Sequence, residues 1–268
     1  MLITIITPSR NQGRYIKDCL ESIHGQTHKE IEHIILDGMS TDNTVAVVAS
    51  YPSRFIQRKD TGPAQAINCG LDMANGEVVC WLNSDDLFFG PDTLRFVAAI
   101  FQQHPNVDVV TGNGYYMTDT GRLTQPVVPS HPNRMTEEWM KRHDMFLQPA
   151  TFWRRNALRL DEQLHFGFDW QLWIEFYRAG LNVLYLPQYL ALYRVHPESL
   201  TQQDPPARRR EIYELIAKYG DSKAQVIWCW IVWKAYCVDE YLPGNFLRLI
   251  ANLVNRAVDK ITSGKIAA

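Results

Sequence analysis

The chain has 268 residues and a formal net charge of −2, with 46% hydrophobic and 21% charged residues. This composition is typical of a soluble globular protein, and the length suits one large α/β domain or a domain with an appendage. A net charge so close to zero gives no electrostatic case for nucleic acid as a partner. The five cysteines have no regular spacing, which argues against a disulfide framework and against a zinc cluster.

The N-terminal residues lack the basic segment and the small-residue cleavage site of a signal peptide. No apolar run approaches the ~20 residues that a membrane-spanning helix needs. Cysteines without a disulfide pattern fit a reducing compartment. We therefore expect a cytoplasmic protein. The C-terminal sequence described below also allows peripheral attachment at the inner face of the membrane.

Short apolar runs alternate with helical patterns in the first part of the chain. Runs at 2–6 and 31–36 each end in a polar loop, and apolar residues at helical spacing follow each of them. A third strand pattern at 55–58 leads to Pro63, which suits the first turn of a helix. This β-α-β-α order predicts a parallel sheet with right-handed crossovers.

The stretch 77–86 is the first indication of a functional site. An apolar run that predicts a buried strand stops at a polar loop containing two adjacent carboxylates, Asp85 and Asp86. In open α/β sheets the carboxyl ends of the strands line the ligand crevice, and such oxygen ligands suit Mg²⁺ or Mn²⁺. The alternative is that these polar residues cap the helix that we expect after Pro91.

Beyond residue 112 the pattern becomes mixed. The sequence at 115–124 predicts a hairpin with a glycine in its turn. The stretch 126–135 contains three prolines and no periodicity, and predicts a loop that is mobile or covers a ligand. Two more short strands are expected at 183–186 and 189–193, so this part should not be purely parallel.

Asp169 lies at the start of a predicted helix. Trp170, Trp173, Ile174 and Tyr177 form its apolar face, which places Asp169 in the first turn. A carboxylate there is stabilised by the helix dipole whatever its function. From these residues alone, the structural explanation is favoured over catalysis.

The C-terminal part of the chain differs in character. Two prolines and three consecutive arginines at 204–210 mark the expected end of the main domain. A tryptophan-rich run at 226–233 is followed at 247–261 by apolar residues at helical spacing, with basic residues among them. We expect 204–268 to be a helical, amphipathic extension. Its helices could lie in a membrane interface or pack on the domain or a second subunit.

Four segments together resemble family 2 of the inverting glycosyltransferases, which use nucleotide-sugar donors. They lie at 5–11, 35–44, 60–70 and 81–86, and the resemblance covers roughly the first two hundred residues. It implies a GT-A fold, in which a Rossmann-like, mostly parallel central sheet is flanked by helices.

The implied domain spans 1–203, and the helical extension follows it. The nucleotide-binding half is expected at about 1–112 and the acceptor-side half at about 113–203.

The resemblance also implies where the nucleotide and the donor sugar bind. The implied donor-binding residues are Thr7, Pro8, Ser9, Arg10, Asp37, Asp60, Gln65, Asn68, Asn83, Ser84 and Asp85. The last three align with the family's Asp-x-Asp motif, whose final carboxylate, Asp85 here, binds the metal on the donor diphosphate. This chain departs from the motif by having Asn83 in the first position.

Two further roles follow from the resemblance. Asp169 falls where the family has its catalytic base, although the Glu that often precedes this Asp is Phe168 here. His196 resembles a late His that some members use as a second metal ligand or as a diphosphate contact. From the sequence alone it could equally be a loop residue. The expected cofactor is therefore a divalent metal, Mn²⁺ or Mg²⁺, on Asp85 and His196.

The predicted reaction is transfer of a sugar from a UDP-sugar to a hydroxyl of a glycan or lipid-linked acceptor. Several aromatic and polar residues could shape the acceptor side or belong to the core, namely Trp139, Phe146, Gln148, Phe152 and Trp153. Membrane contact would involve 222–268, and an oligomer is possible.

Asn83 and Phe168 leave a second function open, that of a non-catalytic nucleotide-sugar-binding or scaffold subunit of a membrane polysaccharide assembly system. A nucleotidyltransferase is disfavoured, because no Gly-rich phosphate loop precedes the first helix.

Overall fold

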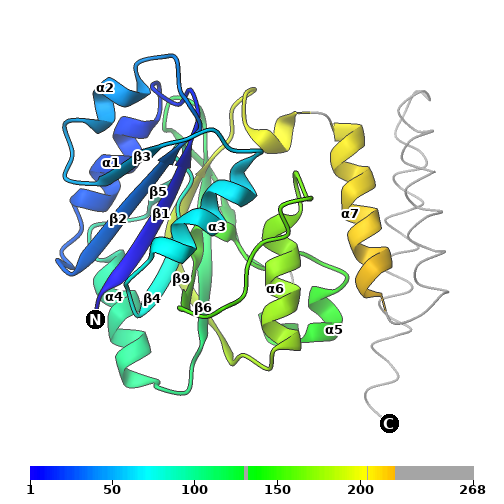
Figure 1. Ribbon diagram of the computed structural model, residues 1–268. Coiled ribbons are helices and arrows are strands. Elements are labelled where there is room, and N and C mark those ends of the chain that lie inside the picture. Colours follow the sequence, from blue (N-terminus) through cyan, green and yellow to red (C-terminus); the bar gives the residue numbers. More distant parts are fainter. Residues whose placement is uncertain (130–131, 204, 221–268) are drawn as a thin grey trace, which may run out of the picture. The chain divides into compact units, whose positions relative to one another are not determined.

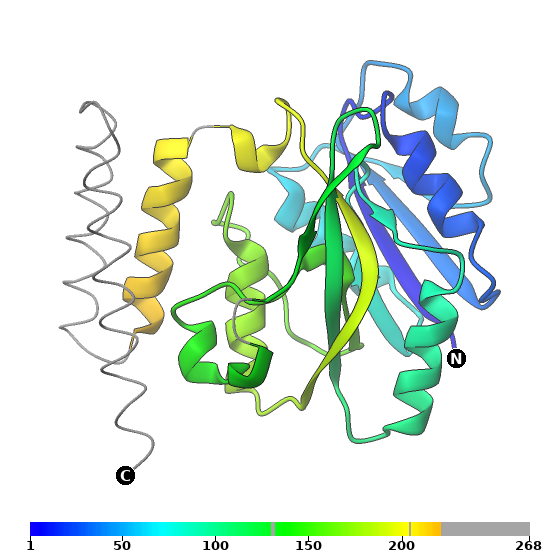
Figure 2. The same ribbon diagram turned by 180° about the vertical axis from the view of Figure 1, so that it is seen from behind.

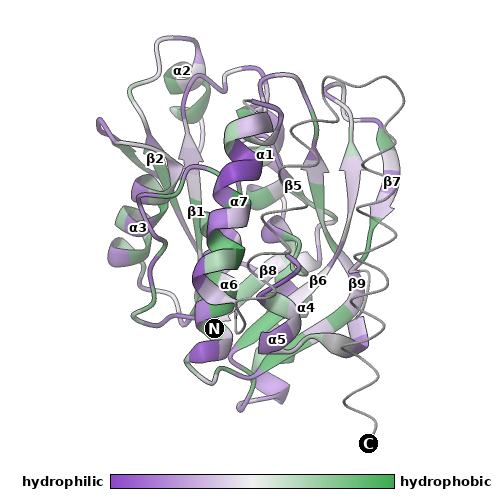
Figure 3. Ribbon diagram, turned by 90° about the vertical axis from the view of Figure 1, so that its right-hand side faces the viewer, coloured by the Kyte–Doolittle hydropathy of each residue, from purple (hydrophilic) through white to green (hydrophobic). Residues whose placement is uncertain are grey.

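A computed structural model describes residues 1–129, 132–203 and 205–220 (Figure 1). The chain divides into two compact units, Met1–Gln203 and Asp204–Ala268. The described part of the second unit is helix α7 (Pro205–Tyr219), which changes from hydrophilic to more hydrophobic towards its C-terminal end (Figure 3). The predicted membrane-binding stretch at 222–268 lies outside the described residues.

The first unit alternates strands and helices along its N-terminal part and is richer in strands afterwards. The strands are β1 (Ile3–Ser9), β2 (Ile31–Asp37), β3 (Arg54–Gln57), β4 (Val78–Trp81), β5 (Leu87–Phe88), β6 (Val109–Met117), β7 (Leu123–Val127), β8 (Thr151–Arg154) and β9 (Val183–Arg194). The helices are α1 (Ile16–His24), α2 (Thr44–Val48), α3 (Pro63–Met73), α4 (Thr93–Gln103), α5 (Glu137–Met140) and α6 (Phe168–Arg178). Short 3₁₀ turns are η1 (Pro132–Arg134), η2 (Gln148–Ala150) and η3 (Leu200–Gln202).

All of these strands belong to one sheet with the order β3-β2-β1-β4-β8-β6-β9-β5, and β7 pairs with β6. The strands β3, β2, β1 and β4 are parallel, which confirms the prediction for the N-terminal part. Strand β8 is antiparallel to both β4 and β6, whereas β6 and β9 run parallel side by side (Figure 2). The sheet as a whole is therefore mixed, as the change of pattern along the sequence indicated.

The apolar runs become buried strands for the reason the sequence predicts. Every residue of β1 and of β4 is buried, because helices cover both faces of a parallel sheet. Helix α1 buries Ile16, Cys19, Leu20 and Ile23, which recur at helical spacing. Pro63 lies in the first turn of α3, as expected.

The hairpin between β6 and β7 is confirmed, and its turn residue Gly121 has φ +82°. The expectation of two short strands at 183–186 and 189–193 is wrong, because β9 is one continuous strand. Its register against β6 shifts between Tyr185 and Tyr189, and Pro187 lies in this irregularity. A proline has no backbone N–H to donate to a neighbouring strand, so in the sequence Pro187 indicates the end of a strand. In the structure a bulge accommodates it within β9.

The loop after β4 is not the start of a helix. Strand β5 follows the loop directly, and α4 begins at Thr93 with Asp92 as its N-cap. The helix-cap explanation for Asp85 and Asp86 is therefore wrong. Within the ranges described, none of the helices combines the length and the hydropathy that crossing a membrane requires.

Helix α3 packs tightly against the sheet at Gly70. A Cβ added there would come within 2.5 Å of Ile6 Cγ2 and within 3.2 Å of Leu36 Cδ2. We expect Gly70→Val to lower the free energy of unfolding by about 3 kcal/mol through overpacking, as measured by urea denaturation. Gly90→Val is the matched control, since a Cβ there has no atom within 4 Å. Equal stabilities of the two variants would show that α3 can move away from the sheet at no cost.

Candidate functional site

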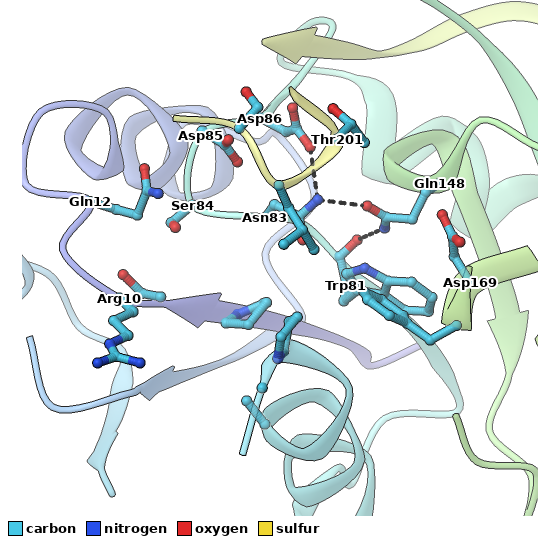
Figure 4. A pocket seen from close by; sticks show the side chains of 18 of the residues that line it. Arg10, Gln12, Trp81, Asn83, Ser84, Asp85, Asp86, Gln148, Asp169 and Thr201 are labelled. Atoms are coloured by element: carbon cyan, nitrogen blue, oxygen red, sulfur yellow. Dashed lines mark hydrogen bonds between the residues drawn. The ribbon is translucent and has the colours of Figure 1, made fainter. Parts of the chain in front are cut away.

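A cavity of about 410 Å³ lies at the carboxyl ends of β1 and β4 (Figure 4). This is where a parallel sheet is expected to bind a ligand. The predicted site residues that line it are Pro8, Ser9, Arg10, Asp60, Asn83, Ser84, Asp85 and Asp169. Residues from the N-terminal and C-terminal halves of the first unit therefore share one cavity.

Thr7 and Asp37 lie behind this lining. Both are completely buried at the ends of β1 and β2. Thr7 Oγ1 lies 3.0 Å from His33 Nε2, and burial lowers the pKa of His33 to about 3, so this ring is neutral. Asp37 accepts hydrogen bonds from the Ser40 amide and from Gln57 Nε2 at 2.9 and 3.0 Å. Thr7 therefore joins β1 to β2, and Asp37 joins the end of β2 to Ser40 in the loop that follows and to Gln57 of β3.

Gln65 and Asn68 lie outside the lining and bind a different part of the chain. Asn68 donates to the Leu160 carbonyl and accepts from the Leu160 amide, both at 2.9 Å. Gln65 and Asn68 also donate to Glu162, at 3.2 and 2.9 Å. Their contacts hold the segment around Leu160 against α3, so in this structure they have a structural role.

The adjacent carboxylates after β4 have different environments. The side chain of Asp85 is 17% exposed, and its Oδ2 lies 3.0 Å from His196 Nε2. Asp86 is only 1% exposed, and its Oδ1 accepts the Arg194 backbone N–H at 2.9 Å. Burial and repulsion from Asp85 raise the pKa of Asp86 well above its usual range. Asp85 is thus the carboxylate that a ligand can reach.

His196 could complete a metal site with Asp85. Donor atoms 3.0 Å apart have the separation of neighbouring ligands in an octahedral shell with bonds of about 2.1 Å. In the described ranges, His, Cys, Asp and Glu do not gather in a group of three or more that could hold a metal. A cation here would complete its shell with substrate phosphates and water, as Mg²⁺ usually does, so the two residues fit such an ion.

Arg194, at the end of β9, holds the backbone of the Asp85 loop. Its guanidinium donates to the Asp85 carbonyl at 2.9 Å and to the Asp119 carbonyl at 3.0 Å, and pairs with Asp18 at 2.8 Å. The side chain is 2% exposed and lies over the Tyr15 ring. Sequence reasoning missed this residue, although a charged residue at the end of an apolar strand was a usable signal.

Asp169 occupies the first turn of α6, as predicted. Helix α6 is fixed by Trp173, whose ring stacks on Trp81 at 5.4 Å with an interplanar angle of 9°. Trp81 belongs to β4 and also lines the cavity. Asp169 lies on the other side of Trp81 and Asn83 from Asp85 (Figure 4). Asp85 and Asp169 therefore lie in different parts of the cavity lining, which also includes Asp60 and Glu198.

Further lining residues were not predicted, among them Gln12 and Tyr193. Gln12 Oε1 and Ser9 Oγ are buried and have no hydrogen-bond partner in the part of the chain that the structure describes. Buried polar atoms are nearly always paired with protein or with ordered water in native proteins, so these two atoms are available to a polar group that enters the cavity. The closeness of Gln12 to the segment at 5–11 was the only signal for it in the sequence.

Known proteins that resemble this chain are glycosyltransferases. Residues 4–160 match the family model described as Glycosyl transferase family 2. An uncharacterized glycosyltransferase of Rickettsia prowazekii (strain Madrid E) is 26% identical over 212 residues, covering 75% of this chain and 66% of the relative. Glycosyltransferase GlyG of Streptococcus pneumoniae serotype 4 is 26% identical over 243 residues, covering 81% and 79%. The chain thus spans just under two thirds of the rickettsial relative's length.

Solved structures share the fold. S. aureus TarS 1-349 in complex with UDP-GlcNAc matches with a TM-score of 0.66 and 21% identity over 85% of this chain and 70% of that chain. The mannosyltransferase PcManGT from Pyrobaculum calidifontis, in complex with GDP-Man and Mn²⁺, matches with a TM-score of 0.63 and 17% identity over 96% and 79%. The mixed sheet with its flanking helices is accordingly a GT-A fold. With more than half of its length matched by the family model, the chain belongs to glycosyl transferase family 2.

Proposed function

We propose that this protein is an inverting, metal-dependent glycosyltransferase that moves a sugar from a UDP-sugar to a hydroxyl of a glycan or lipid-linked acceptor. The observation that carries the proposal is the position of Asp85 and Asp169 in one cavity, on either side of Trp81. A single displacement needs a leaving group and a base on opposite faces of the transferred sugar. In this cavity Asp85 would serve the leaving group through its metal, and Asp169 would serve as the base.

The donor nucleotide would bind at the ends of β1 and β2. Arg10 is an exposed cation at this end of the cavity, and Asp60 also lines it. Burial raises the pKa of Asp60. The unpaired Ser9 Oγ and Gln12 Oε1 would receive hydrogen bonds from the donor. Support also comes from TarS, which has the same fold and is complexed with UDP-GlcNAc.

Asp85 and His196 would hold the divalent cation, Mn²⁺ or Mg²⁺, which when bound neutralises charge on the leaving diphosphate. The structure supports this assignment through the way the loop is fixed. Arg194 binds the Asp85 carbonyl, and the His196 ring packs against Tyr15 at 4.5 Å. The Asp85 backbone and the His196 ring are therefore held in place before any ligand binds, which is how a protein lowers the cost of orienting a site.

Asp169 would act as the general base that takes the proton of the acceptor hydroxyl. The stacked pair of Trp81 and Trp173 holds α6 against β4, so the distance from the base to the donor is set by rigid packing. Phe166 and Phe168 line the cavity beside Asp169 and would exclude water from the reacting hydroxyl. Acceptor sugars commonly pack on such aromatic faces.

Asp169→Asn should reduce turnover by about 10²–10⁴-fold and leave UDP affinity unchanged, because it removes only the proton acceptor. Turnover is measured as release of UDP from a panel of UDP-sugars with candidate acceptors, and affinity by calorimetric titration with UDP. Glu175→Gln, at the other end of α6, is the matched control and should retain full activity. If the unmodified protein binds UDP but turns over none of the sugars, the scaffold function is favoured instead.

Asp85→Ala should remove the dependence of UDP binding on Mn²⁺. We expect Mn²⁺ to raise the UDP affinity of the unmodified protein by at least about tenfold, since the cation held by Asp85 would neutralise charge on the diphosphate. The measurement is calorimetric titration of UDP, GDP and dTDP with and without Mn²⁺. Asp72→Ala removes a carboxylate that is 67% exposed on α3 and serves as the control. A metal effect that persists in Asp85→Ala would exclude Asp85 as the ligand.

A further inference from the structure

The first position of the family motif carries an amide in this chain, and the structure indicates why. Asn83 Nδ2 donates to Asp86 Oδ2 at 3.1 Å and to Gln148 Oε1 at 2.9 Å (Figure 4). Gln148 Nε2 in turn donates to the Trp81 carbonyl at 2.8 Å. We propose that these contacts form an amide relay, in which Gln148 is a positioning residue that turns Asn83 Oδ1 towards the donor, and that the relay requires an amide at position 83.

The Trp81 carbonyl determines which groups donate and which accept along the relay. The Trp81 carbonyl can only accept a hydrogen bond, so Gln148 must direct its NH₂ group to Trp81 and its Oε1 to Asn83. Oε1 can also only accept, so Asn83 must present its NH₂ group to Gln148. The same NH₂ group has a second proton, which reaches Asp86. Each bond from β4 to Asp86 therefore has one possible donor.

An aspartate at position 83 could not take part in this arrangement. Its carboxylate would have only acceptors to offer to Gln148 Oε1, which is itself an acceptor. Gln148 is 8% exposed and Asp86 is 1% exposed, so water could not easily separate these groups. Turning the Gln148 amide around would relieve the repulsion between Gln148 Oε1 and the new carboxylate. It would also break the hydrogen bond from Gln148 Nε2 to the Trp81 carbonyl.

The relay determines which atom of Asn83 meets a ligand. With Nδ2 engaged twice, Asn83 Oδ1 remains, and the residue is half-buried in the cavity lining. No residue in the described ranges donates a hydrogen bond to this atom. Asn83 Oδ1 is thus placed to accept from a hydroxyl of the donor or from a metal-bound water. This assignment rests on the proposed donor site, but the relay itself does not.

The decisive test is to restore the family's own residue in the full-length protein. Asn83→Asp should weaken binding of UDP in the presence of Mn²⁺ by about tenfold, although it recreates the Asp-x-Asp motif. Gln148→Met keeps the length of the side chain without its hydrogen bonds and should weaken UDP binding severalfold by itself. In the Gln148→Met background, Asn83→Asp should cost clearly less, because Oε1 no longer opposes the new carboxylate.

The matched control is Gln26→Met. Gln26 is 2% exposed and donates to the Ser22 and Gly90 carbonyls, so it is a buried, hydrogen-bonded glutamine outside the cavity. This variant should lower the stability but leave UDP binding and the cost of Asn83→Asp unchanged.

Two outcomes would overturn the proposal. One is UDP binding by Asn83→Asp that equals or exceeds that of the unmodified protein. The other is an equal cost of Asn83→Asp with and without Gln148→Met. If the unmodified protein binds no UDP, the proposed donor site is wrong. The relay can then still be tested by comparing the urea unfolding of the unmodified protein, Asn83→Asp, Gln148→Met and the double variant. If Asn83→Asp does not fold, Gln148→Met decides, because unchanged UDP affinity in that variant would remove its positioning role.

Discussion

The geometry of the site depends on the contact between Asp86 and Arg194. The buried Asp86 carboxylate accepts the Arg194 backbone N–H, and the Arg194 guanidinium returns to the Asp85 carbonyl. These bonds join the end of β4 to the end of β9, although β8 and β6 separate the two strands in the sheet. Because both residues are almost completely buried, breaking either bond would leave a polar group without a partner. The loop therefore has one arrangement, with Asp85 turned towards the cavity.

The two halves of the sheet contribute different parts of the site. Parallel strands bring several loops to the same edge, which is why the residues after β1 and β4 share a cavity. The mixed half adds Gln148 from η2 and Asp169 from α6. Aromatic packing of Trp81 joins the halves, because its ring contacts Trp173 of α6 and its carbonyl contacts Gln148. A shift of either half would move Asp169 relative to Asp85.

Polar groups inside this site are fixed by the limited number of ways in which they can pair. Asp86, Asn83 and Gln148 satisfy one another only in one orientation, and the backbone carbonyl of Trp81 fixes it. Such networks are sensitive to single exchanges, because each group removed leaves another unsatisfied. The departure from the family motif at Asn83 is consistent with this network and does not by itself indicate a site that has lost its function.

The sequence by itself determined the elements whose pattern is local. Strands β1, β2 and β4 and the helices α1, α3 and α6 follow from apolar runs and helical spacing. The rule that ligands bind at the carboxyl ends of strands also predicted a crevice at Asp85, and Asp85 lines the cavity. Only the tertiary structure decided the partners. His196 meets Asp85 across 111 residues of sequence, and Gln148 meets Asn83 across 65. A periodic pattern records which face of an element is buried, but not which distant side chain will lie opposite, since that depends on the order and register of strands in the folded sheet.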